Sequence, residues 1–290
     1  MSLHVTRNCR RIVNHRDERQ KYMADIHPSA IVDKQAQLDS DVRIGPYCVI
    51  EGDVRIGSGT VLGPNVCVDR GTTLGKNNQI FPNSVVGGFP QILGWRQDQS
   101  TGGLILGDNN TIRENVTIHR SMFPGEYTRI GHDNLIMAGV HVGHDCQLED
   151  QIVLTNLVQL SGHCKLETGV WLSGLAALHQ FVTLGRWCYS AGMTSITHDV
   201  PPFVIVSGSY PMRVRGVNIR GARRAGLSEE QQQTICQAFK QLYRTSGTLL
   251  ENADKLAQQD GLDDNVRAMI TSIQNSSQHR FGRYLEIFRH

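Results

Sequence analysis

Aliphatic residues recur at every sixth position over much of this chain. From residue 26 to residue 86, each sixth position holds Ile, Val or Leu without interruption. The next residue is often Gly, and the fourth residue after each aliphatic is usually small. Neither the 3.6-residue period of a helix nor the two-residue period of a strand explains this spacing. A sustained six-residue period indicates a repeat architecture.

A parallel β-helix accounts for such a period. Each hexad supplies a short strand and a turn, with the aliphatic side chain in the interior and the small residue beside it. Successive coils pair like strands of one sheet, about 4.8 Å apart, which satisfies the backbone groups from coil to coil. The pattern breaks at 87–105 and at 119–129, and a second run extends from Ile130 to Ile196 with one miss at Ser190. We interpret the two breaks as loops expelled from the wall, where functional residues often lie.

The pattern changes after the two prolines at 201–202. Ser228 and Gln231 have the spacing of a capping box, and an apolar stripe of helical period follows them. We therefore expect one helix to begin after Ser228. Two further helices are expected over 248–259 and 263–276.

The chain is predicted to have three parts. Residues 1–22 hold six basic residues without periodicity, and we expect a disordered basic extension there, with a targeting segment as the alternative. Residues 23–203 are expected to form the all-β solenoid. Residues 204–290 are expected to form a small α-helical C-terminal domain that caps its open end.

Composition excludes several classes of protein. The 290 residues are 39% hydrophobic and 6% aromatic, which allows a full core and is not typical of a disordered chain. The sequence has no run of about 18 apolar residues that would span a membrane. The 29 basic and 27 acidic residues leave a net charge of +2, which gives no argument for a nucleic-acid partner. Seven cysteines without a secretory apolar segment favour reduced thiols and a cytoplasmic location.

Several motifs together resemble one enzyme family. In chain order they are His-Val-Gly-His-Asp-Cys from His141, Ser-Gly-His from Ser161, His-Gln-Phe from His179, Asp-Val-Pro-Pro from Asp199 and Gly-Val-Asn-Ile from Gly216. With the hexads and an expelled loop, they resemble the acyl-carrier-protein-dependent UDP-N-acetylglucosamine O-acyltransferases that start lipid A synthesis. The resemblance covers about residues 23 to 250. It implies a left-handed parallel β-helix with three hexads per coil, assembled as a homotrimer with active sites between subunits.

A coil of three hexads would bring the separated motifs together. Positions i and i+18 then stack about 4.8 Å from one another. Three columns lie side by side: His144 with Gly162 and Gln180, Asp145 with His163 and Phe181, and Gly143 with Ser161 and His179. The convergence of several histidines favours a catalytic patch over a set of structural histidines.

Cys146 and Cys164 would also stack, at the small inward position of the hexad. We expect buried thiols, because an unpaired cysteine often packs as a small hydrophobic residue. A Cys/His metal site is the alternative, but neighbouring residues of a strand point to opposite faces.

The resemblance assigns chemical roles within this patch. His144 matches the general base that takes the proton from the sugar 3-hydroxyl as its oxygen attacks the thioester, a task for a group that titrates near neutral pH. Gly162 matches the backbone N–H donor to the oxyanion, and a glycine allows close approach of the substrate. Asp145 matches a residue beside the acceptor sugar. Direct transfer requires no covalent nucleophile, metal ion or bound cofactor.

Further positions match residues that bind the substrates in this family. His163 and Gln180 would orient the substrate, and the residues near the nucleotide sugar would be His119, His141 and His179. Gln91 matches a position in the first expelled loop, and the positions near the nucleotide are Asn218, Arg223 and Arg224. Gly192 matches the position that limits the depth of the acyl chain. The arginines belong to a basic cluster over 213–224. This cluster suits a nucleotide diphosphate and an acidic acyl carrier protein, with an ordinary solvated face as the alternative.

The first expelled loop departs from the family pattern. The family usually has Gln-Asp-Leu-Lys where this chain has Gln91, Ile92, Leu93 and Gly94, and Arg220 stands where Glu is usual. An acid that helps read the sugar and a lysine that meets the phosphate or sugar are therefore missing. A related nucleotide sugar, or one with an amine at the 3-position, is left open as the acceptor, because an amine attacks a thioester by the same route.

Two other classes of protein are left as alternatives. A zinc carbonic-anhydrase-like trimer would need three histidine ligands and stoichiometric metal. The helical tail and the adjacent His144 and Asp145 argue against it. A non-enzymatic scaffold is disfavoured by the clustered histidines.

Overall fold

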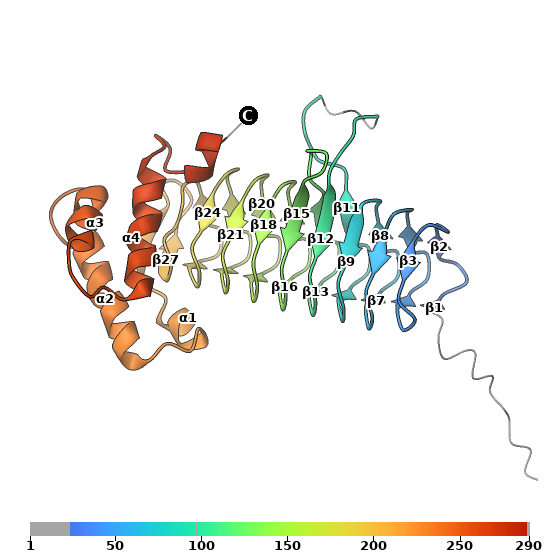
Figure 1. Ribbon diagram of the computed structural model, residues 1–290, viewed down its shortest axis with the longest axis horizontal. Coiled ribbons are helices and arrows are strands. Elements are labelled where there is room, and N and C mark those ends of the chain that lie inside the picture. The colour runs from blue at the N-terminus through green and yellow to red at the C-terminus, as the bar shows by residue number, and fades with distance from the viewer. Residues whose placement is uncertain (1–23, 95, 97, 289–290) are drawn as a thin grey trace, which may run out of the picture.

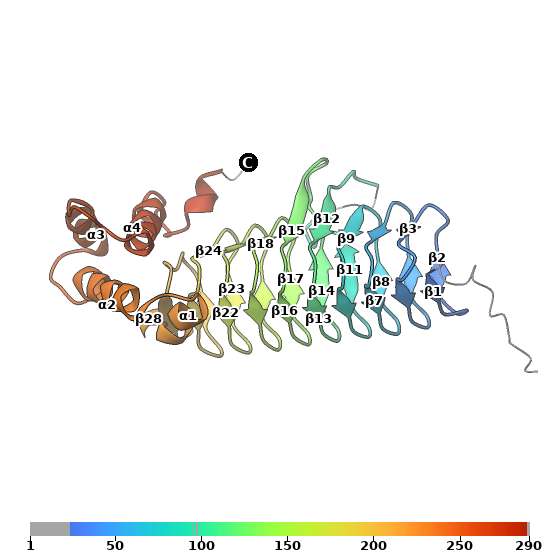
Figure 2. The same cartoon turned by 60° about the horizontal axis from the view of Figure 1, so that its bottom comes forward.

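The described part of the chain is a long β-helix with helices at one end. The computed structural model describes residues 24–94, 96 and 98–288, so the extension expected at 1–22 lies outside the described residues. The chain winds into a left-handed parallel β-helix, and the helices follow at its C-terminal end (Figure 1). Figure 2 shows the strands of successive coils aligned in rows along the solenoid.

Three sheets form the walls of the solenoid. The first sheet contains β1 (Asp25–Ile26), β4 (Arg43–Ile44), β7 (Val61–Leu62), β10 (Gln79–Ile80), β13 (Thr111–Ile112), β16 (Leu135–Ile136), β19 (Val153–Leu154), β22 (Trp171–Leu172), β25 (Tyr189–Ser190), β27 (Val204–Ser207) and β28 (Arg213–Val217). The second contains β2 (Ile31–Val32), β5 (Val49–Ile50), β8 (Cys67–Val68), β11 (Val85–Gly88), β14 (Thr117–His119), β17 (His141–Val142), β20 (Gln159–Leu160), β23 (Ala177–Leu178) and β26 (Ser195–Ile196). The third contains β3 (Gln37–Leu38), β6 (Arg55–Ile56), β9 (Thr72–Leu74), β12 (Gly103–Leu106), β15 (Tyr127–Ile130), β18 (Gln147–Leu148), β21 (Lys165–Leu166) and β24 (Thr183–Leu184).

The strand register confirms a coil of three hexads. Ile44 pairs with Leu62 in the next coil, three hexads further along the chain. Leu74 pairs instead with Leu106, so the first expelled loop lengthens the coil between them. Leu106 pairs with Ile130, so the second loop lengthens the following coil by one hexad. Both insertions leave the wall before the next strand begins. The aliphatic residues before and after each insertion therefore still pair with one another.

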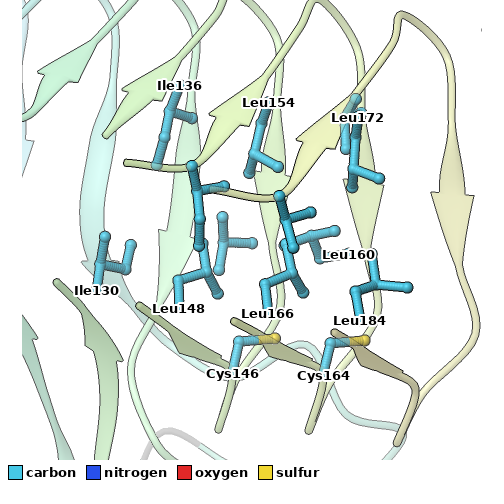
Figure 3. Packing of buried hydrophobic residues seen from close by; sticks show 14 of the residues in the cluster. Ile130, Ile136, Cys146, Leu148, Leu154, Leu160, Cys164, Leu166, Leu172 and Leu184 are labelled. Atoms are coloured by element: carbon cyan, nitrogen blue, oxygen red, sulfur yellow. The ribbon is translucent and has the colours of Figure 1, made fainter. Parts of the chain in front are cut away.

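The aliphatic positions of the hexads form the core. Figure 3 shows Leu148, Leu166 and Leu184 in one row inside the wall, with Cys146 and Cys164 nearby. Complete burial of a leucine side chain contributes about 1.5–3 kcal/mol to folding, so the repeated rows supply much of the stability. Both thiols are buried, and each donates a hydrogen bond to a backbone carbonyl. The expectation of buried thiols is confirmed.

The first sheet continues beyond residue 203. Strand β27 pairs in parallel with β25, and β28 then returns antiparallel to β27. The six-residue pattern does not predict these two strands. The helices that follow are α1 (Ile219–Arg224), α2 (Glu229–Tyr243), α3 (Leu249–Ala257), α4 (Asp264–Ser277) and the 3₁₀ helix η2 (Tyr284–Phe288).

Three of these helices confirm the expected pattern. Helix α2 begins after Ser228, whose side chain accepts from the backbone N–H of Gln231 while the Gln231 side chain accepts from the Ser228 backbone. This is the capping box that the sequence predicts. Helices α3 and α4 match the two further segments. Among the described residues, none of the helices is long and apolar enough to cross a membrane.

Candidate active site

The turns between the second and third sheets carry the candidate site. In three consecutive coils these turns contain His144 with Asp145, then Gly162 with His163, then Phe181. The rings of His144 and His163 lie 5.1 Å apart between centroids, edge to face. The rings of His163 and Phe181 are stacked at 4.6 Å. The stacking expected from a coil of three hexads is therefore present in the structure.

The backbone adopts an unusual conformation at this turn position. Asp145 and His163 have φ of 61°, and Phe181 has φ of 66°. For residues other than glycine, left-handed backbone costs about 1–2 kcal/mol. The same conformation recurs at turns away from the site, at Asn65, where asparagine tolerates it well, but also at Leu157, so it belongs to the geometry of the coil. At the site, the packed coils hold an acid, an imidazole and a phenyl ring in it, and all three line one cavity.

His144 and Asp145 form a hydrogen-bonded pair. His144 Nδ1 lies 2.7 Å from Asp145 Oδ2. The backbone N–H of Met122 donates to Oδ2 at 3.3 Å, and the Ser121 hydroxyl donates to Oδ1. Because a carboxylate only accepts hydrogen bonds, this contact places the proton of a neutral His144 on Nδ1. The Nε2 lone pair is then available to take a proton from a substrate.

Asp145 is held in its ionised form. Burial alone would raise the pKa of this carboxyl group. The hydrogen bonds from His144, Ser121 and Met122 favour the charged form and together outweigh burial, so the pKa of Asp145 is lowered. The carboxylate also stabilises the positive charge that His144 would acquire on accepting a proton.

A cavity of about 700 Å³ lies in front of this pair. Its lining includes the polar side chains of His144, Asp145, His163 and Gln180. It also includes apolar side chains, which are Ile92 from the first expelled loop, Met122 and Phe123 from the second, Phe181, and Phe288 from the C-terminal segment. Both expelled loops therefore contribute to the cavity, as expected for loops that leave a regular wall.

His119 and His141 form a second pair beside the first. Their ring centroids are 5.0 Å apart. His119 Nδ1 bonds the carbonyl oxygen of Phe89 at the base of the first loop, and His141 Nδ1 lies 3.0 Å from the Thr117 hydroxyl. Burial lowers the pKa of both histidines, that of His141 to about 4. Both rings are therefore neutral near pH 7 and suited to hydrogen bonding rather than to charge pairing.

The residues expected near the nucleotide line a different cavity. Asn218, Arg220 and Arg224 border a space of about 640 Å³ beside Trp171 on the first sheet. The Arg224 guanidinium lies over the Trp171 ring at 4.9 Å. Arg223 is exposed and is not part of this lining. One chain therefore does not bring these arginines to His144.

The side chain of Asn218 has structural partners. It is buried, accepts from the backbone N–H of Gly221 at 3.0 Å, and donates to the carbonyl of Trp187 at 2.8 Å. The bond from Gly221 caps helix α1, and the bond to Trp187 ties this cap to the solenoid. The amide therefore positions the start of the helix that carries Arg220 and Arg224.

Other expected residues lie outside the catalytic cavity. Gln91 and Gly94 are exposed, although Ile92 between them lines the cavity. Gly192 lies in the turn between β25 and β26, which joins the first sheet to the second. His179 Nδ1 bonds the carbonyl of the next residue at 3.0 Å. None of these four residues lines the cavity that contains His144.

The sequence pattern does not identify several residues that shape the site. Ser121 and Met122 hold the carboxylate of Asp145, and the Thr128 hydroxyl accepts from its backbone N–H at 2.8 Å. All three lie within the break at 119–129, which was the only signal for them. Phe288 lies beyond the residues that carry the family resemblance.

Comparison with protein families gives two matches. Residues 199–282 match the family model described as Udp N-acetylglucosamine O-acyltransferase, Domain 2. Residues 26–70 match the model described as bacterial transferase hexapeptide (six repeats). The two matches fall on the C-terminal region and on the first coils of the solenoid.

Individual relatives match over most of their length. An acyl-[acyl-carrier-protein]–UDP-N-acetylglucosamine O-acyltransferase of Janthinobacterium sp. (strain Marseille) is 48% identical over 239 residues, which are 82% of this chain and 89% of the relative. The protein of that name from Paraburkholderia phymatum is 42% identical over 261 residues, 88% of this chain and 98% of the relative. The solved UDP-N-acetylglucosamine O-acyltransferase of Moraxella catarrhalis superposes with a TM-score of 0.80 at 36% identity, covering 86% of this chain and 96% of that one. The Francisella novicida enzyme superposes at 0.81 with 31% identity, covering 86% and 91%.

Proposed function

Because the chain belongs to the acyl-[acyl-carrier-protein]–UDP-N-acetylglucosamine O-acyltransferase family, we propose that it transfers a 3-hydroxyacyl chain from acyl carrier protein to the 3-position of a UDP-N-acetylglucosamine-type sugar. This is the first step of lipid A biosynthesis. The observation that carries the proposal is the pair of His144 and Asp145 within the cavity, beside Gly162 in the next coil.

The geometry supports direct transfer with His144 as the general base. Nε2 of His144 takes the proton of the sugar 3-hydroxyl as the oxygen attacks the thioester carbonyl. The carbonyl oxygen gains negative charge, which the backbone N–H of Gly162 stabilises. When the tetrahedral intermediate collapses, the C–S bond breaks, and the protonated His144 returns the proton to the leaving thiolate. Asp145 holds the imidazole in the required tautomer throughout.

Close packing between coils supports the role of Gly162. A Cβ atom built on this glycine would lie 2.7 Å from Cε1 and Nε2 of His144. Real Cβ contacts are not this short, so any larger residue would displace the imidazole. The glycine keeps the base and the neighbouring backbone N–H within reach of one small substrate group.

The complete site is proposed to form between protomers of a homotrimer. The cavity that holds His144 and the cavity that holds Arg224 share no lining residue and lie on different parts of the wall. A second copy of the chain would bring the arginine cavity of one protomer to the histidine cavity of another. Mixing His144→Ala with Arg224→Ala protein should then restore activity, because some sites in a mixed trimer contain both intact residues. Activity that stays absent in trimers shown to be mixed would contradict a shared site.

We expect this chain to recognise the acceptor sugar through other contacts than those usual in the family. Ile92 lines the catalytic cavity at the position where the family usually has an acid, and its side chain offers no hydrogen bond. UDP-N-acetylglucosamine and its 3-amino counterpart should therefore be compared as acceptors with the same acyl carrier thioester. The mass of the product distinguishes an ester from an amide, and failure of both acceptors would overturn the proposed function.

The partners and location follow from the same proposal. Arg213, Arg215 and Arg223 are exposed beside the end of the solenoid, where a positive surface suits an acidic acyl carrier protein. Buried thiols such as Cys146 and Cys164 fit a reducing compartment, so we place the enzyme in the cytoplasm.

A metal site is the alternative at the same place. His144, Asp145 and His163 offer ligand atoms within 4.8 Å of one another, and zinc takes such donors. Asp145 would have to give up its hydrogen bond to His144 in order to bind the metal through the same oxygen. Metal analysis of the active protein, followed by assay after chelation, separates the two functions. Stoichiometric zinc and loss of activity on its removal would favour the metal site.

A further inference from the structure

The C-terminal segment returns to the β-helix and reaches the catalytic cavity. Helix η2 follows α4 and lies on the side of the solenoid from which the expelled loops project (Figures 1 and 2). Its last residue, Phe288, lines the cavity that contains His144 and His163. The match to the family model ends at residue 282, so this aromatic side chain lies outside it.

Three hydrogen bonds anchor the segment to the last coils. The N–H of Asp199 donates to the carbonyl of Gly282 at 2.7 Å, and the N–H of Tyr284 donates to Oδ2 of Asp199 at 2.8 Å. Nη1 of Arg283 donates to the carbonyl of Thr197 at 2.9 Å. These contacts join one turn of the solenoid to the start of η2.

A buried ion pair fixes the segment internally. Nε and Nη2 of Arg283 lie 2.7 and 2.6 Å from Oε2 of Glu286, and the two side chains are 8% and 10% exposed. Charge-assisted bonds of this kind are strong and directional. The rings of Tyr284 and Phe288 also meet edge to face, with centroids 5.4 Å apart. The position of Phe288 is therefore set by several contacts along the segment.

We propose that Phe288 is a donor-binding residue that forms part of the apolar wall against which the acyl-thioester arm of the donor lies. This inference rests on the proposed function. Phe123, Phe181 and Ile92 line the same cavity, so an apolar ligand would meet several apolar side chains there. The polar nucleotide has its candidate arginines in the other cavity. Glu286 of η2 is engaged in the anchor, which leaves Phe288 as the contribution of this helix to the cavity.

The expected consequence is weaker capture of the donor without a slower chemical step. Phe288 is 56% exposed, so a bound acyl arm could cover much of its ring. At the usual value for apolar area removed from water, loss of this contact should raise the KM for the acyl carrier thioester by about three- to tenfold. A phenyl ring has no hydrogen bond to offer His144 or Asp145, so kcat should stay near the wild-type value.

The test compares Phe288→Ala with Ile287→Ala in the full chain. Ile287 is the preceding residue, is 44% exposed, and does not line the cavity. Both variants are assayed for kcat and for the KM of each substrate, and light scattering reports the assembly. We expect Phe288→Ala to raise only the donor KM, Phe288→Leu to restore part of the loss, and Ile287→Ala to behave like the wild type.

Several outcomes would overturn the proposal. An unchanged donor KM in Phe288→Ala, or an equal change in Ile287→Ala, would remove the assigned contact. A change in the acceptor KM would place the sugar nucleotide against Phe288 instead. Dissociation of the assembly would make Phe288 a contact between copies. If the wild-type protein transfers an acyl chain to neither acceptor, the proposed function fails together with this inference. If the wild-type protein is active and Phe288→Ala has the same donor KM, this inference alone is overturned.

Discussion

Replacing Asp145 by asparagine tests whether its carboxylate acts through His144. The substitution keeps the size of the side chain but removes its charge and one acceptor oxygen. In the native protein, one oxygen lies 2.7 Å from His144 Nδ1 and the other accepts from Ser121. An amide must present its NH₂ group to one of these partners. If the NH₂ faces His144, the proton moves to Nε2, and the imidazole can no longer take a proton from the substrate.

The size of the effect follows from the bond that is lost. A hydrogen bond to a charged group contributes about 1.5–3 kcal/mol. Since each factor of ten in rate corresponds to about 1.36 kcal/mol, Asp145→Asn should lower kcat/KM by roughly 10- to 150-fold through this bond alone. The wrong tautomer lowers kcat/KM further. The upper limit is the whole contribution of a general base, which is about 10²–10⁴-fold.

The assay measures kcat/KM for Asp145→Asn beside the matched variant Ser121→Ala. Removal of the Ser121 hydroxyl leaves the bond between His144 and Asp145 in place, so we expect a loss of only a few-fold. Thermal unfolding checks that both variants fold like the wild type. An Asp145→Asn enzyme within threefold of the wild type, or an equal loss in Ser121→Ala, would refute the reasoning.

Four further outcomes are expected. His144→Ala should lower kcat by about 10²–10⁴-fold with an unchanged melting temperature, and transfer near the wild-type rate would show that another group is the base. Gly162→Ala places a Cβ 2.7 Å from the His144 ring, so steady-state assays should show a loss of about tenfold or more. Arg120→Met removes a buried guanidinium that donates to two backbone carbonyls at 3.0 and 3.2 Å. Urea denaturation should show that the free energy of unfolding falls by about 2–4 kcal/mol. An unchanged urea midpoint would contradict this expectation. The pKa of His141 falls from 6.5 to about 4 on folding, so the folded state binds fewer protons between these values and stability should fall as the pH is lowered through this window. Urea midpoints across this range should show a flatter slope for His141→Asn than for the wild type.

The regular part of the fold could be predicted because each coil repeats one constraint. Ile44 and Leu62 are buried for the same reason and pair one coil apart. The same register pairs Val142 with Leu160, which places the turns with His144 and Gly162 next to each other. The family resemblance contributed the length of the coil and its hand, since the six-residue period alone leaves both open. The stacked histidines then followed from arithmetic on the sequence.

The irregular contacts could not be predicted in this way. Ser121 and Met122 reach Asp145 from an expelled loop, whose path depends on tertiary contacts and has no period. Phe288 reaches the cavity only because the anchors near Asp199 turn the chain back. Matching by motif also gave Asn218 a role at the nucleotide without showing that its amide already bonds Trp187 and Gly221.

The two ends of the solenoid differ in how they are covered. Among the described residues, β1, β2 and β3 each pair with one neighbour, and Ile26 is 40% exposed, whereas Ile44, its partner in the next coil, is buried. The stability of such an array is a sum of contacts between neighbouring units. Amide hydrogens of the first coil should therefore exchange with deuterium fastest, with protection rising coil by coil toward the end covered by β27 and β28. Local unfolding would therefore begin at the first coil. His144 lies several coils away, so its geometry would be kept while the first coil unfolds and refolds.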